Sequence, residues 1–410
     1  MSTLADPLFV ETPTARAVKA GSEESLLQAL DALAPLLRKS AREVEGTRRV
    51  PMTHIEAIRA TGFFNLVKPG AFGGRDASFD LLVKANFVLA RYCASTAWVA
   101  GLLAAHQWLL ASFPAQAQRD VWDADPDALL CGSYAPVGKA EAVDGGFRIA
   151  GKWSFASGCD CSQWAFCATL VPNGSGGVEP AFLLVPSSDY VISDTWDVVG
   201  LAGTGSKTLV VDNAFVPAHR VLTFAQSTSG RTPGAELYGV AGYGIPMLTM
   251  IPACLASVAV GSAQGAYNDY LEATGTRVTR GAVAGAYQKM AEFATIQQRV
   301  AEAAASVDAA QEILLRDLRD VAGKAGAGVE VTVEDRITCR RGQAFAVSLS
   351  LWAVELLNAS TGGAGLQSSN PIQRAWRDVN AVARHISLNW DAVSTMYGQL
   401  VLGLQPKGQY

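Results

Sequence analysis

The sequence predicts an α+β protein in which helices, then strands, then helices again follow one another along the chain. Three observations predict this order. Apolar residues recur at helical spacing over 1–127, fall in short runs between Gly and Pro turns over 128–235, and return to long helical patterns over 236–410. We therefore expect an N-terminal helical domain, a middle β-barrel or sandwich and a C-terminal four-helix bundle with these bounds. A chain of 410 residues is long enough for two or three domains.

Four helices are expected in the N-terminal segment. Ser22 is a candidate cap for a helix that a stripe of leucines continues to Leu37. Pro51 suits the first turn of a second helix. Ser78 would cap the third helix and Ser95 the fourth.

Short runs with strand character fill the middle segment. The turn Asp144-Gly145-Gly146 joins two of them as a hairpin. The expected strands cover about 129–134, the two sides of that turn within 140–150, 164–170, 181–185, 190–194 and 208–211. A stretch rich in Gly, Ser and Thr over 225–244 is the expected linker. The bundle helices beyond it are separated at Gly281, at 323–328 and at 361–371.

Composition and charge exclude several classes of protein. The formal net charge is −4 and no block of Lys or Arg occurs, so no nucleic-acid partner is expected. The two most apolar stretches, 97–113 and 247–260, are interrupted by polar residues and a proline, so we expect buried helices and no membrane span. Residues 1–20 contain acids and prolines without an apolar core, so no secretion signal is expected.

The cysteines indicate a reducing compartment. There are 7 of them, an odd number scattered along a long chain, which favours free thiols in the cytoplasm over a disulfide framework. Cys159-Asp160-Cys161 is a single C-x-C pair without a nearby His. Zinc needs three or four protein ligands, so no metal site is expected.

The C-terminal segment carries a glycine-rich turn, Thr361-Gly362-Gly363-Ala364-Gly365, then a helix with Arg377-Asp378, and then His385. This order resembles the flavin-binding segment of the acyl-CoA dehydrogenases, in which a catalytic glutamate lies about two helical turns after the Arg-Asp pair. Here His385 and Ile386 stand at that distance, and no carboxylate follows until Asp391. A dehydrogenase needs that base to remove an α-proton. The resemblance therefore implies an acyl-CoA dehydrogenase-like fold with a different flavin reaction.

Three further motifs lie in the middle segment: Ser133-Tyr134-Ala135-Pro136, GKWSFASGCD over 151–160, and Gly203-Thr204-Gly205-Ser206. With the C-terminal motif they resemble the flavin-dependent two-component hydroxylases. These enzymes share the acyl-CoA dehydrogenase fold and include the oxygenases of p-hydroxyphenylacetate and steroid-ring hydroxylation. The resemblance extends from about residue 30 to 402, with all motifs in the same order.

The resemblance implies the oxygenase component of a two-component monooxygenase. Reduced flavin, FMN or FAD, would come from a separate flavin reductase and react with O₂ to give a C4a-hydroperoxide that hydroxylates a phenol or related aromatic substrate. The flavin site of this family is shared between subunits, so a homotetramer is implied. The chain has no G-x-G-x-x-G turn after a strand with an acid downstream, which agrees with a flavin that is reduced elsewhere.

The resemblance also assigns cofactor contacts. Ser157 is expected near flavin N5, because a hydroxyl both donates and accepts hydrogen bonds, and Trp153 is expected to pack on the flavin. The Thr204-Gly205-Ser206 loop would offer backbone amides to phosphate or ring oxygens. Thr361-Gly362-Gly363 would do the same for a neighbouring subunit's flavin, and Arg277, with Arg280 near it, would meet the flavin phosphate. Taken alone, these residues also suit a turn serine, a core tryptophan, glycine turns and a helix-end cation.

His385 and His106 are the candidate catalytic histidines. A neutral imidazole accepts a proton from a phenol near neutral pH, so His385 is expected to act as the base that makes the ring nucleophilic. His106 lies in mid-helix in an apolar stretch and would bind the substrate hydroxyl or the hydroperoxide, with a hydrogen-bonded core histidine as the alternative. His54, expected on a surface helix, and His219, expected after a strand, have no assigned role.

Other functions remain open at this stage. An acyl-CoA dehydrogenase or oxidase with a displaced base would have to use Glu355, the nearest upstream acid on the preceding helix. N-hydroxylation of an amine or amino sugar would use the same scaffold. A helical binding protein without catalytic activity would leave the glycine-rich loops unexplained.

Overall fold

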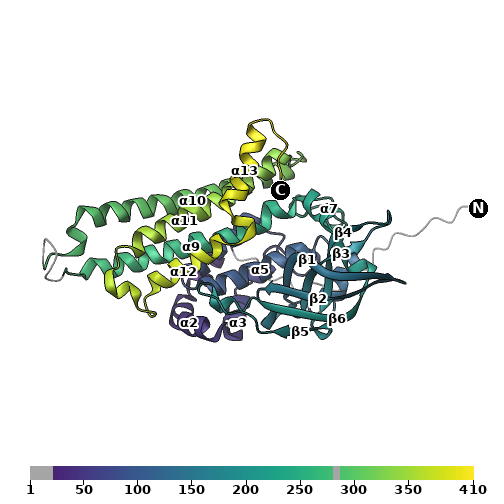
Figure 1. The fold of residues 1–410 in the computed structure, drawn as a ribbon, viewed down its shortest axis with the longest axis horizontal. Coiled ribbons are helices and arrows are strands. Elements are labelled where there is room, and N and C mark those ends of the chain that lie inside the picture. Colours follow the sequence, from purple (N-terminus) through teal and green to yellow (C-terminus); the bar gives the residue numbers. More distant parts are fainter. Residues whose placement is uncertain (1–21, 280–286) are drawn as a thin grey trace, which may run out of the picture.

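The computed structural model describes residues 22–279 and 287–410. A group of N-terminal helices, a seven-stranded sheet and a long helical bundle follow one another in chain order (Figure 1). This order confirms the predicted fold class. Arg280 and Gly281, which the sequence singles out, lie outside the described residues.

The N-terminal helices are α1 (Glu23–Asp31), α2 (Ala34–Thr47), α3 (Met52–Ala60), α4 (Phe79–Ala90), α5 (Ala94–Leu110) and α6 (Ala115–Trp122). Ser22 caps α1 as expected, because its hydroxyl accepts the N–H of Ser25 at 3.1 Å. The leucine stripe is divided between α1 and α2, since Pro35 at the start of α2 has no N–H to continue a helix through it. Cys93 is the N-cap of α5, so Ser95 lies inside that helix and does not cap it.

The strands are β1 (Leu130–Val143), β2 (Gly146–Ala156), β3 (Trp164–Pro172), β4 (Val178–Pro186), β5 (Tyr190–Ser193), β6 (Lys207–Pro217) and β7 (Val221–Thr223). They form one sheet in the order β5-β6-β2-β1-β3-β4-β7. Only the β1–β3 pair is parallel among these strands. Val143 lies opposite Gly146, which confirms the predicted hairpin. One face of the sheet packs on the helices, and the other face has an apolar cluster of its own.

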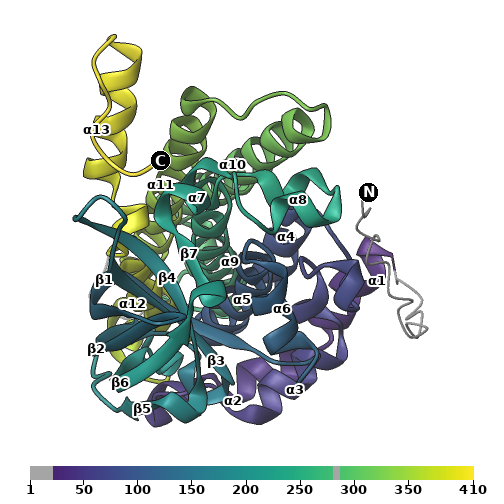
Figure 2. The ribbon, with the colours of Figure 1, turned by 90° about the vertical axis from the view of Figure 1, so that its right-hand side faces the viewer.

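The bundle consists of α9 (Met247–Thr276), α10 (Ala294–Gly326), α11 (Val333–Asn358) and α12 (Pro371–Ala383). The segment before it, expected as a linker, carries the short helices α7 (Phe224–Ser229) and α8 (Ala235–Tyr238). The last helix, α13 (Trp390–Val401), packs on α11 and projects from the body (Figures 1 and 2). Among the described residues, α9 has the length and apolar character of a membrane span, but 94% of its apolar window is buried against other elements.

Helix α5 lies between the bundle and the sheet (Figure 1). It packs against α4 and α9 on one side and against β1 on the other. Almost all of its side chains are buried, including His106 and Trp98. Side chains on α5 therefore meet groups from both of the flanking parts.

Candidate active site

A chain of four buried hydrogen-bonding side chains joins α5 to the two glycine-rich loops of the sheet. Trp98 Nε1 donates to Ser157 Oγ at 3.0 Å, and Ser157 Oγ lies 2.7 Å from Ser206 Oγ. Ser206 Oγ lies 2.7 Å from Thr204 Oγ1, which donates to the carbonyl oxygen of Leu201 at 2.9 Å. The predicted residues Ser157, Thr204 and Ser206 are thus brought together.

This chain has a single direction of donation. Thr204 donates its only hydroxyl hydrogen to the Leu201 carbonyl oxygen, so Ser206 must donate to Thr204. Ser206 then has no hydrogen left, so Ser157 must donate to Ser206. Ser157 already accepts the indole N–H of Trp98. Its oxygen therefore has acceptor capacity left and no free hydrogen to give.

The loop that carries Thr204 and Ser206 is held at several points. Leu201 and Gly205, on either side of the short 3₁₀ helix η5 (Ala202–Thr204), both have positive φ, 53° and 54°. The N–H of Leu201 donates to Asp378 Oδ1 on α12 at 2.7 Å. Lys207, just after the loop, forms an ion pair with Asp160 at 2.8 Å. The loop is therefore fixed to both α12 and the 3₁₀ turn η3 (Cys159–Cys161) that follows β2.

His385 lies next to the indole of Trp98. The two ring centroids are 5.7 Å apart, with the rings edge to face. His385 precedes the 3₁₀ helix η10 (Ile386–Leu388), and its Nδ1 accepts the N–H of Ser387 at 3.2 Å. The neutral ring then carries its hydrogen on Nε2, the nitrogen left for a bound molecule. Loss of contact with water, and secondarily the charge of Arg340, lower the pKa of His385 to about 4.

His106 has the opposite hydrogen-bonding pattern. Its side chain is 1% exposed, and its Nδ1 lies 2.6 Å from the carbonyl oxygen of Leu130, to which it must donate. Nε2 is therefore bare, and it has no hydrogen-bond partner among the described residues. Burial lowers the pKa of His106 to about 4, so the ring is neutral at pH 7. His106 is two turns beyond Trp98 on α5, about 12 Å along the helix axis.

Aromatic rings surround His106. Its ring centroid is 5.4 Å from that of Phe166 and 5.8 Å from that of Tyr134, and Tyr134 in turn packs on Phe182 at 4.9 Å. The hydroxyl of Tyr134 is buried and, within the described part of the chain, also lacks a partner. Two unsatisfied polar groups among aromatic rings suit a polar aromatic molecule.

The other predicted cofactor residues lie at the far end of the bundle. Arg277 follows α9, and its Nη1 donates to the carbonyl oxygen of Ser360 at 3.3 Å, just before the Thr361-Gly362-Gly363 turn. Gly362 has φ 65°, and a Cβ at this position would lie 2.7 Å from Arg277 Nη2. Helix α12 separates this turn from His385, and its 13 residues span about 20 Å. The predicted residues therefore form two separate groups within one chain.

The position of Trp153 argues against the expected packing on the flavin. Trp153 is 0% exposed in the apolar cluster on the other face of the sheet, and its Nε1 donates to the carbonyl oxygen of Ala168 at 2.6 Å. Phe155, two residues later, is 71% exposed and has a strained φ of 64°. The resemblance assigned the flavin contact to Trp153 and gave Phe155, two positions before Ser157, no role of its own.

Three other expectations are corrected or explained by local contacts. His54 is buried, not on the surface, between Ser40 Oγ at 2.7 Å and Thr96 Oγ1 at 3.1 Å. The carboxylate of Glu355, the alternative base, is exposed and accepts the indole N–H of Trp376 at 2.5 Å. His219 follows β6 as expected and bonds to Asp120 at 2.7 Å.

The Cys159-Asp160-Cys161 pair has a structural role at the loop. Cys159 Sγ donates to the carbonyl oxygen of Gly205 at 3.6 Å, and Cys161 Sγ to that of Gly158 at 3.2 Å. Burial raises the pKa of both thiols to about 12, so they stay protonated. Among the described residues no three His, Cys, Asp or Glu side chains form a group that could hold a metal ion.

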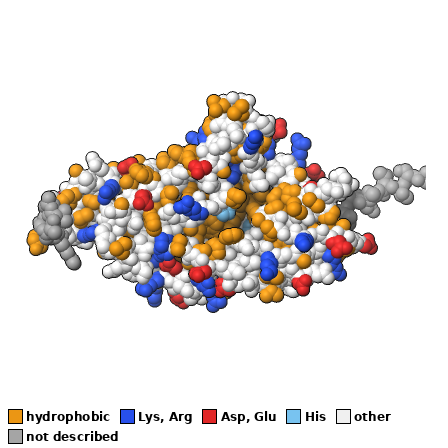
Figure 3. All heavy atoms as spheres, viewed as in Figure 1, with side chains coloured by type: hydrophobic (Ala, Val, Ile, Leu, Met, Phe, Trp, Pro, Cys, Tyr) orange, Lys and Arg blue, Asp and Glu red, His pale blue; other side chains and the backbone are white. Residues whose placement is uncertain are grey.

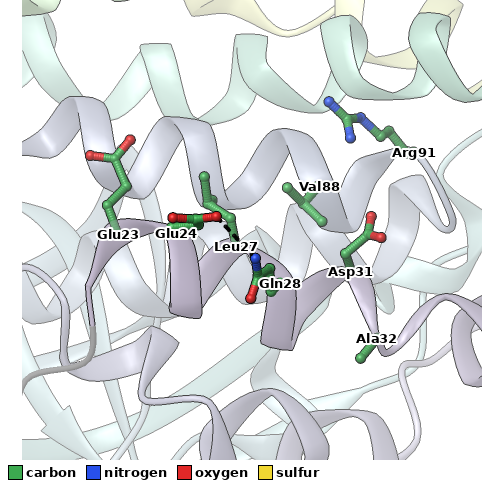
Figure 4. Close-up of a pocket in the computed structure, with 8 residues that line it drawn as sticks. All are labelled: Glu23, Glu24, Leu27, Gln28, Asp31, Ala32, Val88 and Arg91. Carbon is green, nitrogen blue, oxygen red and sulfur yellow. Dashed lines mark hydrogen bonds between the residues drawn. The ribbon is translucent and has the colours of Figure 1, made fainter.

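The surface shows two hollows of different character. Figure 3 shows a hollow between the bundle and the sheet, below α13, with apolar side chains and part of a histidine in it. A second, open hollow of about 740 Å³ lies between α1 and α4 (Figure 4), lined by Glu23, Glu24, Leu27, Gln28, Asp31, Ala32, Val88 and Arg91. None of the predicted site residues lines this second hollow, so its size does not connect it with the chemistry.

Comparison with known proteins agrees with this geometry. The family model "Acyl-CoA dehydrogenase, C-terminal domain" matches residues 253–390. The FADH₂-dependent resorcinol hydroxylase, oxygenase component, of Rhizobium sp. (strain MTP-10005) is 62% identical over 92% of this chain and 94% of its own length. Two solved structures superpose closely. The 3-HSA hydroxylase from Rhodococcus sp. RHA1 has TM-score 0.89 and 38% identity over 94% of this chain and 98% of its own. XiaF from Streptomyces sp., in complex with FADH₂ and glycerol, has TM-score 0.86 and 28% identity over 94% of this chain and 97% of its own.

The fold and the match to the C-terminal domain define a protein of the acyl-CoA dehydrogenase fold. His385 stands where, by the resemblance of the C-terminal motif, the dehydrogenases have a glutamate. The chain belongs to the flavin-dependent monooxygenases, as an oxygenase component.

Proposed function

We propose that this chain hydroxylates a phenol of the resorcinol type, next to a ring hydroxyl, with FADH₂ that a separate flavin reductase supplies. The most similar of the relatives described above carries resorcinol in its name, and others act on further phenolic compounds by their names. Reduced flavin, when bound, supplies the electrons that activate O₂ for insertion into the ring. The residues of this chain bind and orient the reactants and exclude water.

The observation that carries the proposal is the direction of the hydroxyl chain. Ser157 donates its hydrogen to Ser206 and presents only acceptor capacity to the site. Reduced flavin has a hydrogen on N5 that needs an acceptor, whereas oxidised flavin has a bare N5 that needs a donor. The chain is therefore polarised for the reduced cofactor, as expected of a protein that receives flavin already reduced.

The surrounding residues fit a flavin ring. Phe155 offers an exposed phenyl face two residues from Ser157, and strained backbone of this kind is concentrated at functional sites. The positive φ at Gly205, together with the contact of its carbonyl with Cys159, holds the loop close to Ser157. We propose Phe155, in place of Trp153, as the residue that packs on the flavin.

The two histidines would meet the substrate with opposite polarity. His106 presents a bare Nε2 and would accept a hydrogen bond from a substrate hydroxyl. His385 presents Nε2–H and would donate to the oxygen next to the reacting carbon, so that this hydroxyl ionises more readily. The sequence suggests His385 as a proton acceptor. Because Ser387 donates its N–H to Nδ1 of His385, the structure favours His385 as a hydrogen-bond donor through Nε2–H. This role also promotes ionisation of the substrate hydroxyl.

A shared flavin site and a homotetramer remain part of the proposal. Arg277 and the Thr361-Gly362-Gly363 turn lie at the opposite end of α12 from His385, which supports a contribution to a neighbouring subunit's flavin. Apolar side chains are exposed near this end of the bundle and along α13, where a second copy would cover them: Trp352, Leu366, Ile386, Trp390, Leu402 and Leu404. The free, buried cysteines suit the cytoplasm, where the reductase would also act.

The test supplies chemically reduced FAD to the purified protein without oxygen, then adds ¹⁸O₂ and resorcinol. The expected product is a trihydroxybenzene that carries one ¹⁸O atom, detected by mass spectrometry. Without a reductase or reduced flavin, NADH should not be consumed. A protein that oxidises an acyl-CoA in the absence of O₂, or that oxygenates an amine and no phenol, would overturn the proposal.

A further inference from the structure

Arg340 is a buried cation without a described anionic partner. It lies in the second turn of α11 and is 4% exposed. Its Nη1 donates to Oε1 of Gln343 at 3.2 Å, while its Nε has no hydrogen-bond partner within residues 22–279 and 287–410. No carboxylate of these residues forms an ion pair with it. Burial lowers the pKa of Arg340 to about 10, so the guanidinium keeps its charge at neutral pH.

Among the described residues, Arg340 has the neutral side-chain oxygen of Gln343 as a hydrogen-bond partner and no carboxylate in an ion pair. A buried, unpaired cation is strongly unfavourable unless an anion or a set of acceptors surrounds it. An anion that arrives with a ligand would remove this cost.

Arg340 lies on the helix that packs against the turn after His385. The 3₁₀ helix η10, which begins after His385, packs against both α9 and α11. Gln343, the neighbour of Arg340, donates to the carbonyl oxygen of Thr249 on α9 at 2.8 Å, and the Thr249 hydroxyl has no partner among the described residues. The charge of Arg340 also acts on the imidazole of His385, whose pKa it helps to lower.

We propose that Arg340 binds the ionised hydroxyl of the aromatic substrate, together with Nε2–H of His385, as a phenolate-binding pair. This inference rests on the proposed function and adds the residue that selects the ionised form. When the phenol binds, its hydroxyl loses a proton to the solvent and its oxygen keeps the electron pair. The guanidinium then neutralises the new charge.

A phenolate suits this position better than a ring carboxylate, the other source of an oxyanion. His385 packs on Trp98, and Trp98 donates to Ser157 in the hydroxyl chain that we assign to the flavin. An oxygen held by Arg340 and His385 would thus lie near the reacting carbon. The substrate hydroxyl that is bonded next to the reacting carbon must lie close to the flavin. A carboxylate at another position on the ring has no such requirement.

The test measures the ionisation of a bound probe without flavin, so it does not depend on turnover. The probe is 4-nitrophenol, whose phenolate is yellow, titrated against pH with the full-length protein. In the wild type, binding should lower the pKa of the probe by about one unit or more, a tenfold change in its ionisation constant. Arg340→Met should abolish most of this shift, and Arg340→Lys should keep part of it because the charge remains.

Two further ligands identify what Arg340 recognises. 4-Nitroanisole cannot ionise, so its affinity should be the same for the wild type and Arg340→Met. If Arg340→Met weakens 4-nitrobenzoate and leaves the ionisation of 4-nitrophenol unchanged, the partner is a carboxylate and the proposal is overturned. A wild type that fails to bind 4-nitrophenol, or binds it without a pKa shift, overturns it as well.

A structural role for Arg340 gives a separate result. Removing an unpaired buried charge should leave Arg340→Met at least as heat-stable as the wild type. A lower melting temperature with a normal ionisation shift in the variant would show that Arg340 only supports the fold. Hydroxylation of resorcinol by the wild type tests the proposed function independently. If it occurs while Arg340→Met still ionises the probe normally, only the assignment of Arg340 fails.

Discussion

Asp378 on α12 accepts a 2.7 Å hydrogen bond from the backbone N–H of Leu201, the residue that begins the loop with Thr204 and Ser206. The Asp of the Arg-Asp motif thus holds the loop that carries Thr204 and Ser206, although it lies 177 residues after Leu201 in the sequence. Its neighbour Arg377 bonds to Glu45 and to the carbonyl oxygen of Val199 in the same loop. The pair therefore fixes the position of the loop that we assign to the flavin.

Asp378→Asn should change how stability depends on pH. Burial raises the pKa of Asp378 from 3.8 to about 6, despite the opposing charges of Arg374 and Arg377. The folded state then holds this proton more tightly than the unfolded state. The contribution of Asp378 to the free energy of unfolding is therefore full below pH 4 and is lost as the pH rises through 6, by about 3 kcal/mol. Asn keeps the acceptor oxygen and cannot titrate, so it should remove this slope.

Urea unfolding from pH 4 to pH 7 measures the difference between the two proteins, in which other titrating groups cancel. Asp378→Ala is the matched variant without an acceptor. It leaves the N–H of Leu201 unsatisfied and should cost about 1–3 kcal/mol at any pH. Parallel pH profiles for wild type and Asp378→Asn would contradict the raised pKa.

Ser157→Ala should weaken the preference for reduced flavin. It removes the acceptor for N5–H, a loss of about 0.5–1.5 kcal/mol or roughly 2–10-fold in FADH₂ affinity, with little effect on FAD. Ser206→Ala is the informative control, because it frees the Ser157 hydrogen to donate to the bare N5 of oxidised flavin. That variant should bind FAD more tightly. Dissociation constants for FADH₂ under argon and for FAD in air test the two variants. A substitution that changes the affinity for both flavin forms equally would refute the single direction of donation in the hydroxyl chain.

Substitutions at the two histidines should respond differently to pH. His385→Ala should lose hydroxylation at neutral pH, by about 10²-fold, and regain it toward the phenol pKa of about 10, where phenolate forms unaided. His385→Gln keeps an N–H donor without a basic nitrogen, so a donor role predicts that it retains much of the activity. His106→Ala should raise KM at every pH, because an acceptor for a substrate hydroxyl is lost.

The readout is product yield per FADH₂ in single turnovers across pH, with H₂O₂ measured as the uncoupled fraction. A His385→Gln variant as defective as His385→Ala would restore the role of general base suggested by the sequence. Normal coupling in both variants at pH 7 would remove His385 from the reaction.

Phe155→Gly should make the protein more stable and a poorer flavin binder. Phe155 has a φ of 64° that only glycine adopts without strain, and its exposed ring loses little packing when removed. A gain of about 1 kcal/mol in stability is expected, with a several-fold loss of FADH₂ affinity as the stacking surface disappears. Phe155→Ala should lose the same affinity without the gain in stability. Unchanged flavin affinity in both variants would exclude contact with the cofactor.

The sequence predicted the order of the three parts because the hydrophobic period changes clearly at the sheet and again at the bundle. The glycine-rich motifs also identified Ser157, Thr204 and Ser206, which the fold does bring together. The sequence could not decide which of Trp153 and Phe155 faces the proposed flavin site. The strand leaves the regular β conformation at Phe155, which breaks the alternation of its two faces. Arg340 carries no sequence signal at all. The proposal for Arg340 depends on its burial without a carboxylate partner among the described residues, which only the folded structure shows.

The length of α12 has a genetic consequence. It keeps His385 beyond one end and the Arg277–Gly362 contact beyond the other, with a helix of about 20 Å between them, so damage to one group leaves the other intact. If the two groups serve flavins in different subunits, His385→Ala and Gly362→Val chains that are each nearly inactive at neutral pH should recover activity when they are co-expressed. Some sites in the mixed assembly would then receive an intact residue of each kind. Two defective alleles of this gene would complement each other in one cell, which no protein with self-contained active sites allows.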